Sequence, residues 1–126
     1  MAKVALVLLA DSETAEGTGR ALHSVIYAEE LASKGNEVKL IFDGAGVRWV
    51  KKILADEANP VTKAFMGLKM GVYSQSVEKH VCKFCSAVFQ VPEADSQKLG
   101  FDIAGEYQGH PDLSALIADG FHIITL

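Results

Sequence analysis

Both cysteines of this chain stand at C-x-x-C spacing, as Cys82 and Cys85, where a strand-like stretch gives way to a helix-like one. The thiolate is the reactive form of cysteine, and a helix N-terminus with neighbouring cations favours it over the thiol. Lys79, His80 and Lys83 are the cations that the sequence places nearby. The pattern predicts a reactive thiol at Cys82, with Cys85 as the resolving partner of a dithiol or as a core residue.

A zinc site is a second interpretation of the same residues. His80, Cys82 and Cys85 would supply three ligands for tetrahedral zinc, and His110 is the distant residue that would complete the set. Structural zinc sites often have a second ligand pair at similar spacing, and the chain holds only two cysteines. We therefore expect no metal, and thiol chemistry at Cys82 needs no organic cofactor.

Composition and charge limit the class of protein. A formal net charge of −4 argues against a nucleic-acid surface, which needs clustered Lys and Arg. The apolar run Val4–Ala10 is shorter than a membrane span and ends at Asp11. Two closely spaced cysteines without an export signal suit a reducing compartment. We expect a cytoplasmic protein that binds neither nucleic acid nor membrane.

Apolar segments alternate between strand and helix patterns along the whole chain, which predicts an α/β fold. The predicted strands are Val4–Leu9, Val38–Phe42, Glu78–Val81, Phe101–Gly105 and Phe121–Leu126. Six helices are predicted. The first follows the loop Asp11–Gly19, the second starts at Val47, and the third follows the Asn59-Pro60 cap. The fourth follows Cys82, the fifth spans Pro92–Leu99, and the sixth spans Pro111–Ala118 with Leu113, Leu116 and Ile117 on its buried face. We expect a single domain over 1–126, built as a three-layer α/β/α sandwich with a five-stranded, mainly parallel sheet.

Ligands of an open parallel sheet bind at the carboxyl ends of its strands. Four segments fall there, namely Asp11–Gly19, Asp43–Gly46, the turn at Cys82 and Glu106–Pro111. The expected binding residues are Asp11, Ser12, Asp43, Gly44, His80 and His110. The run Gly17-Thr18-Gly19 lacks both the dinucleotide fingerprint and the P-loop ending, so we interpret it as loop and helix cap.

Several stretches resemble one known family. The segment Val81-Cys82 with its following helix, then Val91-Pro92-Glu93 and Lys98-Leu99-Gly100, resembles the cysteine segment of the DsrE/DsrF-like family. The resemblance extends to the turn Phe42-Asp43-Gly44 and to the closing strand. It implies a five-stranded parallel sheet, assembly into trimers or hexamers and, in sulfur-relay members, a cysteine that carries persulfide sulfur between proteins. Cys82 matches that cysteine.

The leading hypothesis is a small sulfurtransferase or sulfur carrier, in which Cys82 takes sulfane sulfur from a donor protein and passes it to an acceptor protein. The chain departs from the family pattern at Lys83-Phe84-Cys85, where small apolar residues usually follow the active cysteine. A second thiol there would attack a persulfide on Cys82, releasing sulfide and leaving a disulfide. The alternatives are a thiol–disulfide redox protein that uses Cys82 and Cys85, and a non-catalytic oligomeric binding module.

Overall fold

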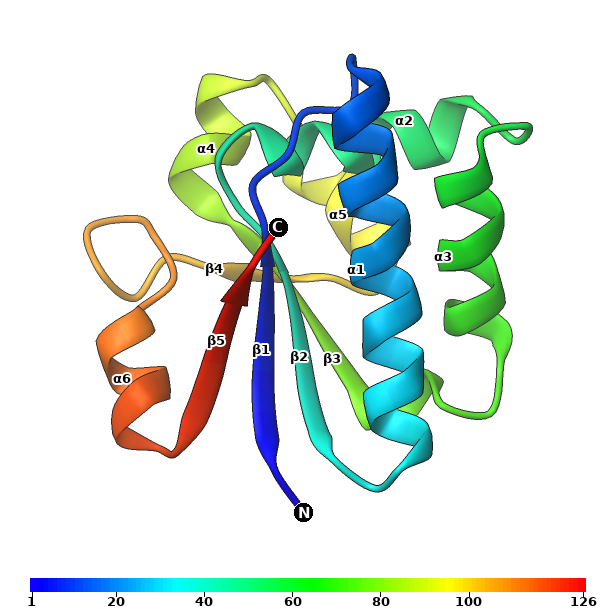
Figure 1. Ribbon diagram of the computed structural model, residues 1–126. Coiled ribbons are helices and arrows are strands. Elements are labelled where there is room, and N and C mark those ends of the chain that lie inside the picture. Colours follow the sequence, from blue (N-terminus) through cyan, green and yellow to red (C-terminus); the bar gives the residue numbers. More distant parts are fainter.

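The computed structural model, which describes residues 1–126, is a five-stranded sheet with helices on both faces (Figure 1). The strands are β1 (Lys3–Leu8), β2 (Glu37–Phe42), β3 (Val77–Cys82), β4 (Asp102–Ala104) and β5 (Phe121–Thr125). The α-helices are α1 (Ala15–Ser33), α2 (Trp49–Ala55), α3 (Pro60–Met70), α4 (Lys83–Val88), α5 (Glu93–Lys98) and α6 (Leu113–Ala118), and the 3-10 helices are η1 (Gly44–Arg48) and η2 (Ser74–Ser76). None of the helices combines the length and the apolarity that crossing a membrane requires.

The sheet has the strand order β4-β3-β2-β1-β5, and every pairing in it is parallel. This confirms the predicted α/β fold with five strands. Central strands of a parallel sheet are buried on both faces, and β1 accordingly reads as a continuous apolar run after Lys3, while β2 ends in the buried apolar run Leu40-Ile41-Phe42. Because all strands run the same way, the segments that follow β2, β3 and β4 leave the sheet at one edge.

One face of the sheet carries the main core, to which α1, α2 and α3 contribute. Its centre is an aromatic cluster of Phe42, Phe65 and Phe101, with ring centroids 4.7 to 6.4 Å apart. Trp49 is fully buried beside it and donates its indole N–H to the Ala10 carbonyl at 3.0 Å. That bond ties the start of α2 to the end of β1, because a buried indole N–H needs an acceptor.

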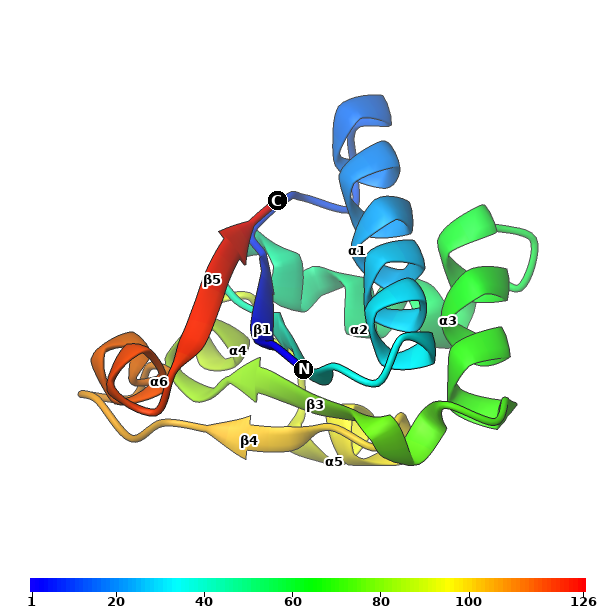
Figure 2. The same cartoon turned by 60° about the horizontal axis from the view of Figure 1, so that its bottom comes forward.

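The other face is covered by α6, which lies across the sheet from α1 and α3 (Figure 2). Its core is small and consists of Ala5, Val7, Ile41 and Phe121, with Leu116 packed against it. The predicted burial of Leu113 and Ile117 is wrong, since these side chains are 37% and 62% exposed. A six-residue helix at the sheet edge presents only one narrow side to the strands, and Leu116 occupies it.

Helix α1 begins earlier than the sequence pattern predicts. The expected loop ran to Gly19, but the helix starts at Ala15 and Thr14 caps it, accepting from the N–H of Gly17 at 2.9 Å. Thr is a favourable N-cap residue because its side-chain oxygen satisfies a free N–H of the first turn. The glycines therefore lie inside the helix, away from any loop that would wrap a phosphate.

Candidate functional site

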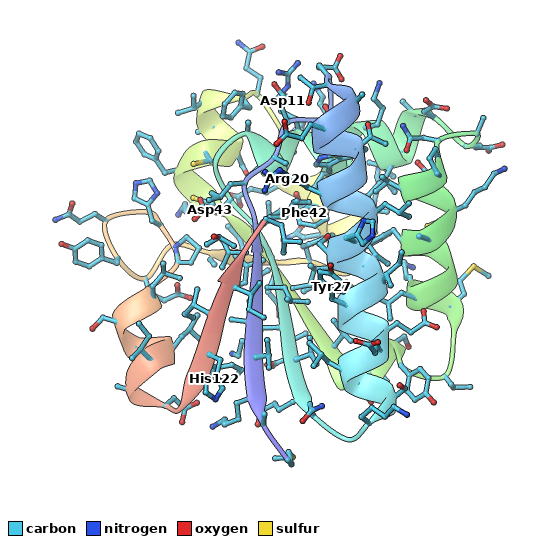
Figure 3. The ribbon with its side chains drawn as sticks, in the orientation of Figure 1. Asp11, Arg20, Tyr27, Phe42, Asp43 and His122 are labelled. Carbon is cyan, nitrogen blue, oxygen red and sulfur yellow. The ribbon has the colours of Figure 1, made fainter.

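Four side chains with metal-binding or nucleophilic atoms meet at the carboxyl edge of the sheet. They are Asp43, Cys82, Cys85 and His110, and their candidate ligand atoms all lie within 4.8 Å of one another. They come from three separate segments: the end of β2, the junction of β3 with α4, and the loop after β4. Figure 3 shows Asp43 at that edge, close to the ribbon of α4.

Cys82 is the last residue of β3 and the N-cap of α4. The strand pairing Cys82↔Ala104 holds its backbone in the sheet, and Ser86 donates its hydroxyl to the Cys82 carbonyl at 2.7 Å. Its Sγ accepts the N–H of Cys85 at 3.4 Å, so the sulfur takes the place that an oxygen fills in common caps. With an exposed fraction of 0%, Cys82 presents no sulfur to solvent.

Cys85 stands in the first turn of α4 and is half-buried. Its thiol donates to Oδ1 of Asp43 at 3.6 Å, across the gap between α4 and the loop that follows β2. The same Oδ1 accepts the N–H of Gly44 at 2.8 Å, because Asp43 caps η1. The carboxylate is therefore oriented by a hydrogen bond within its own loop as well as by the thiol of Cys85.

His110 belongs to a tight turn that holds it beside the cysteines. Tyr107 and His110 exchange two backbone hydrogen bonds of 2.8 Å, with Gln108 and Gly109 between them at φ values of 51° and 89°. Two consecutive positive φ values are the mark of a type I′ turn, in which glycine adopts the second position without strain. The turn thus fixes where the imidazole emerges.

The turn is docked onto α4 by backbone and side-chain contacts. The carbonyl of Gly109 accepts the N–H of Phe84 at 2.8 Å, and the Phe84 ring lies 4.8 Å from the imidazole of His110. In this position Nδ1 of His110 is 3.4 Å from Sγ of Cys82. Phe84 was not among the predicted site residues, whereas the turn lies within the predicted segment Glu106–Pro111, in which the Gln108-Gly109 pair is a recognisable turn signal.

The environment of Cys82 favours the thiol over the thiolate. Burial raises its pKa to about 12, and the neighbouring Cys85 thiol and the negative charge of Asp43 act in the same direction. The N–H of Cys85 opposes them by donating to the sulfur. The predicted activation by nearby cations is therefore wrong for this conformation.

The three predicted cations are directed elsewhere. Lys79 is buried and donates its ammonium to the carbonyl of Val77 at 3.3 Å. The Lys83 stem packs along Gly105, where an added Cβ would lie 3.2 Å from Lys83 Cδ. His80 lies in a pocket of about 270 Å³ on the α6 side of the sheet, lined also by Lys39, Glu106 and Asp112. None of these three groups is among the causes that shift the pKa of Cys82.

The remaining predicted residues divide between the site and its surroundings. Asp43 and His110 join the cysteines, whereas Gly44 contributes only its backbone N–H. Asp11, in the segment after β1, instead forms an ion pair with Arg48 of η1 at 3.1 Å. Ser12, also outside the group, donates its hydroxyl to Glu13 at 2.9 Å. The four-ligand set considered for zinc also differs from the observed group, in which Asp43 stands where His80 was expected.

Comparison with known families matches nearly the whole chain to one of them. The model of the DsrE/DsrF-like family matches residues 5–126. An uncharacterized protein of Methanocaldococcus jannaschii, MJ0733, is 32% identical over 105 residues, which cover 83% of this chain and 78% of that protein. The structure resembles BT1422 of Bacteroides thetaiotaomicron, a conserved protein of unknown function, with a TM-score of 0.61 and 22% identity over 97% of this chain and 94% of the other. The second likeness concerns the fold alone.

Proposed function

The chain belongs to the DsrE/DsrF-like family, and we propose that it carries sulfane sulfur as a persulfide on the pair Cys82 and Cys85. The observation that carries the proposal is the placement of two free thiols at the binding edge of the sheet, one fully buried and one partly buried. The fully buried thiol, that of Cys82, is the one that matches the carrier cysteine of sulfur-relay proteins. The partly buried thiol, that of Cys85, is the more accessible of the two to a donor.

Sulfur would enter at Cys85. The thiolate of Cys85 attacks the outer sulfur of a donor persulfide, so that a new S–S bond forms to Cys85 as the donor's own S–S bond breaks. The donor leaves as a thiolate and takes up the proton that Cys85 lost. No external oxidant or reductant is required, because the oxidation level of the sulfane sulfur is transferred with it.

Cys82 then governs the fate of the persulfide on Cys85. Attack on the outer sulfur moves it to Cys82, whereas attack on the inner sulfur releases hydrogen sulfide and leaves a Cys82–Cys85 disulfide. The raised pKa of Cys82, about 12, keeps this thiol protonated near neutral pH and so slows both attacks. The thiol of Cys82 is thereby compatible with a persulfide on Cys85 that lasts until an acceptor arrives.

Transfer between proteins requires a docking surface next to the thiols. Phe84 and Val88 on α4, and Tyr107 in the adjacent turn, are large apolar side chains that are all more than half exposed. Apolar side chains around a reactive group support a protein partner as sulfur donor or acceptor.

We also propose a homo-oligomer, a trimer or hexamer, as the family resemblance implies. Light scattering on the purified protein tests this, and a monomer at all concentrations would contradict it.

Mass spectrometry tests the sulfur chemistry directly. Wild-type protein incubated with a small persulfide donor should gain the mass of one sulfur atom, and a reducing agent should remove it. Cys85→Ser should fail to load, whereas Cys82→Ser should load and retain the sulfur for longer. Unmodified wild-type protein, or equal loading of Cys85→Ser and wild type, would refute the proposal.

A dithiol switch is the second candidate, and the closeness of the two sulfurs favours it. Both lie in a group whose ligand atoms are within 4.8 Å, so a modest movement of the first turn of α4 would bring them to S–S bonding distance, about 2.05 Å. The reduction potential of the pair separates the candidates. A disulfide that forms at the potential of the cytosolic glutathione pool indicates redox work, and one that never forms excludes it.

A further inference from the structure

We propose that Asp43, Cys82, Cys85 and His110 form a binding site for one zinc ion. The group supplies two sulfurs, one imidazole nitrogen and one carboxylate oxygen, all within 4.8 Å of one another. Four ligands of these types make a complete set for tetrahedral zinc. The proposal depends on neither the persulfide nor the disulfide chemistry of the cysteines.

Two of the ligand–ligand distances match those of a tetrahedral zinc site. Zinc lies about 2.3 Å from sulfur and about 2.0 to 2.1 Å from nitrogen or oxygen, which places sulfur about 3.5 Å from nitrogen or oxygen along a tetrahedral edge. Sγ of Cys82 is 3.4 Å from Nδ1 of His110. Sγ of Cys85 is 3.6 Å from Oδ1 of Asp43. Two edges of the tetrahedron are therefore present before any ion binds.

The choice of metal follows from the ligand types. Thiolate sulfur and imidazole nitrogen suit zinc, whereas magnesium and calcium require oxygen ligands throughout. Thiolates also suit copper(I), but a carboxylate is a poor ligand for that soft ion. A mixed set of two sulfurs, one nitrogen and one oxygen thus favours zinc over magnesium, calcium and copper(I).

Neighbouring groups hold the ligands in place. The N–H of Cys85 donates to Sγ of Cys82, and the N–H of Gly44 donates to Oδ1 of Asp43. His110 is held by its type I′ turn, whose Gly109 carbonyl is bonded to the N–H of Phe84. Such contacts orient the ligands and strengthen metal binding. The site is therefore organised by the fold itself.

Binding would change the protonation of the site. Zinc takes the place of two thiol protons, so that one Zn²⁺ and two thiols give two zinc–thiolate bonds and two released protons. With the carboxylate of Asp43 and a neutral His110, the occupied site carries a net charge of −1. The zinc-bound and persulfide-bearing forms are mutually exclusive, because both use the sulfur electron pairs of the same cysteines.

Metal titration of the whole chain tests the proposal. Reduced protein stripped with a chelator should bind one zinc per chain, with release of protons into a weak buffer. Cobalt(II) as a spectroscopic substitute should give the strong visible bands of tetrahedral coordination and a sulfur-to-cobalt charge-transfer absorption. Cys82→Ser, Cys85→Ser, His110→Ala and Asp43→Asn should each weaken zinc binding by roughly 100-fold or more, beyond the effect of an outer contact.

Two controls make the outcome specific. His80→Ala should bind zinc as the wild type does, since His80 lies outside the group. Zinc binding and sulfur loading are measured in separate experiments on the wild-type protein, so that failure of one is observed independently of the other. Absence of stoichiometric zinc, a cobalt spectrum without sulfur charge transfer, or a requirement for His80 would overturn the proposal.

Discussion

The thiol of Cys85 lies 3.6 Å from the carboxylate of Asp43, although the two residues are 42 positions apart in the sequence. The contact joins the loop after β2 to the first turn of α4, which follows the adjacent strand β3. It places a negative charge beside two thiols where cations were expected. The negative charge of Asp43 is one cause of the raised pKa of Cys82.

Replacing Asp43 should make Cys82 more acidic. The negative charge of Asp43 is one cause of the raised pKa of Cys82, so Asp43→Asn should lower that pKa from about 12. Burial is the larger cause and persists, so the value should stay above the ordinary 9.0. The thiolate absorbance of Cys85→Ser, measured against pH with and without Asp43→Asn, reports Cys82 alone. An unchanged titration would show that the carboxylate does not act on this thiol.

The two cysteines should differ in their rate of alkylation. Cys85 is only partly buried, whereas Cys82 is fully buried and its pKa is raised to about 12. Iodoacetamide at neutral pH should therefore modify Cys85 faster, by about tenfold or more. Peptide mapping after timed quenching measures both rates. The same reaction in urea serves as control and should remove the difference, and faster modification of Cys82 in the native protein would refute the assignment.

Gly46 should be essential to the position of the loop that carries Asp43. An added Cβ at Gly46 would lie 2.0 Å from the carbonyl oxygen of Leu8, so Gly46→Ala must push η1 away from β1. We expect a loss of about 1–3 kcal/mol in the free energy of unfolding, the usual cost of overpacking. Gly67→Ala is the matched control in α3, where no atom lies within 4 Å. It should leave stability unchanged or raise it by up to about 1 kcal/mol in urea unfolding, and equal effects of both substitutions would contradict this account.

The aromatic cluster should contribute strongly to stability. Phe65 is fully buried and its ring is stacked 5.6 Å from that of Phe101. Phe65→Ala should lower the free energy of unfolding by about 3–5 kcal/mol through lost burial and the cavity left behind. Val72→Ala is the control, since Val72 is 87% exposed, and it should change stability by less than about 0.5 kcal/mol. Chemical denaturation compares the two, and a small effect at Phe65 would show that the core repacks.

His80 should make the protein less stable in mild acid. Burial and the positive charge of Lys39 lower its pKa below the usual 6.5, against the weaker opposing charges of Glu78, Asp102 and Glu106. The unfolded chain therefore takes up a proton at a higher pH than the folded one, and the free energy of unfolding falls as the pH drops below 6.5. Nε2 of His80 is buried without a hydrogen-bond partner, so no acceptor at that atom stabilises the protonated ring.

His80→Gln removes this titration while keeping a polar side chain. The difference in unfolding free energy between wild type and variant should grow in favour of the variant as the pH falls from 7 towards 5. Groups that titrate in both proteins cancel in that difference. Parallel curves over this range would show that His80 is not the responsible group.

Local sequence patterns predicted most of the helices and strands, because these elements depend largely on residues that are neighbours in the sequence. The cap Asn59 with Pro60 at the first position of α3 is a local hydrogen-bonding arrangement, and Asn59 does accept from Val61 at 2.9 Å. The weak strand before Cys82 was identified from its place in the alternation and is confirmed as β3. Local patterns failed where packing decides, as at Ile117, whose exposure depends on how α6 lies over the sheet.

The order of strands and helices, the parallel sheet and the position of the C-x-x-C segment between a strand and a helix could all be determined from the sequence alone. Each depends on residue types within one segment or on the alternation of segments along the chain. Which loops meet Cys82 was decided only by the tertiary structure. The strand order places β2 and β4 on either side of β3, and so brings Asp43 and His110 to the thiols, while Asp11, which follows β1, lies apart from them. His80 belongs to β3 itself but lines the pocket on the α6 side of the sheet. The charge around Cys82, and with it the acidity of its thiol, follows from those long-range contacts.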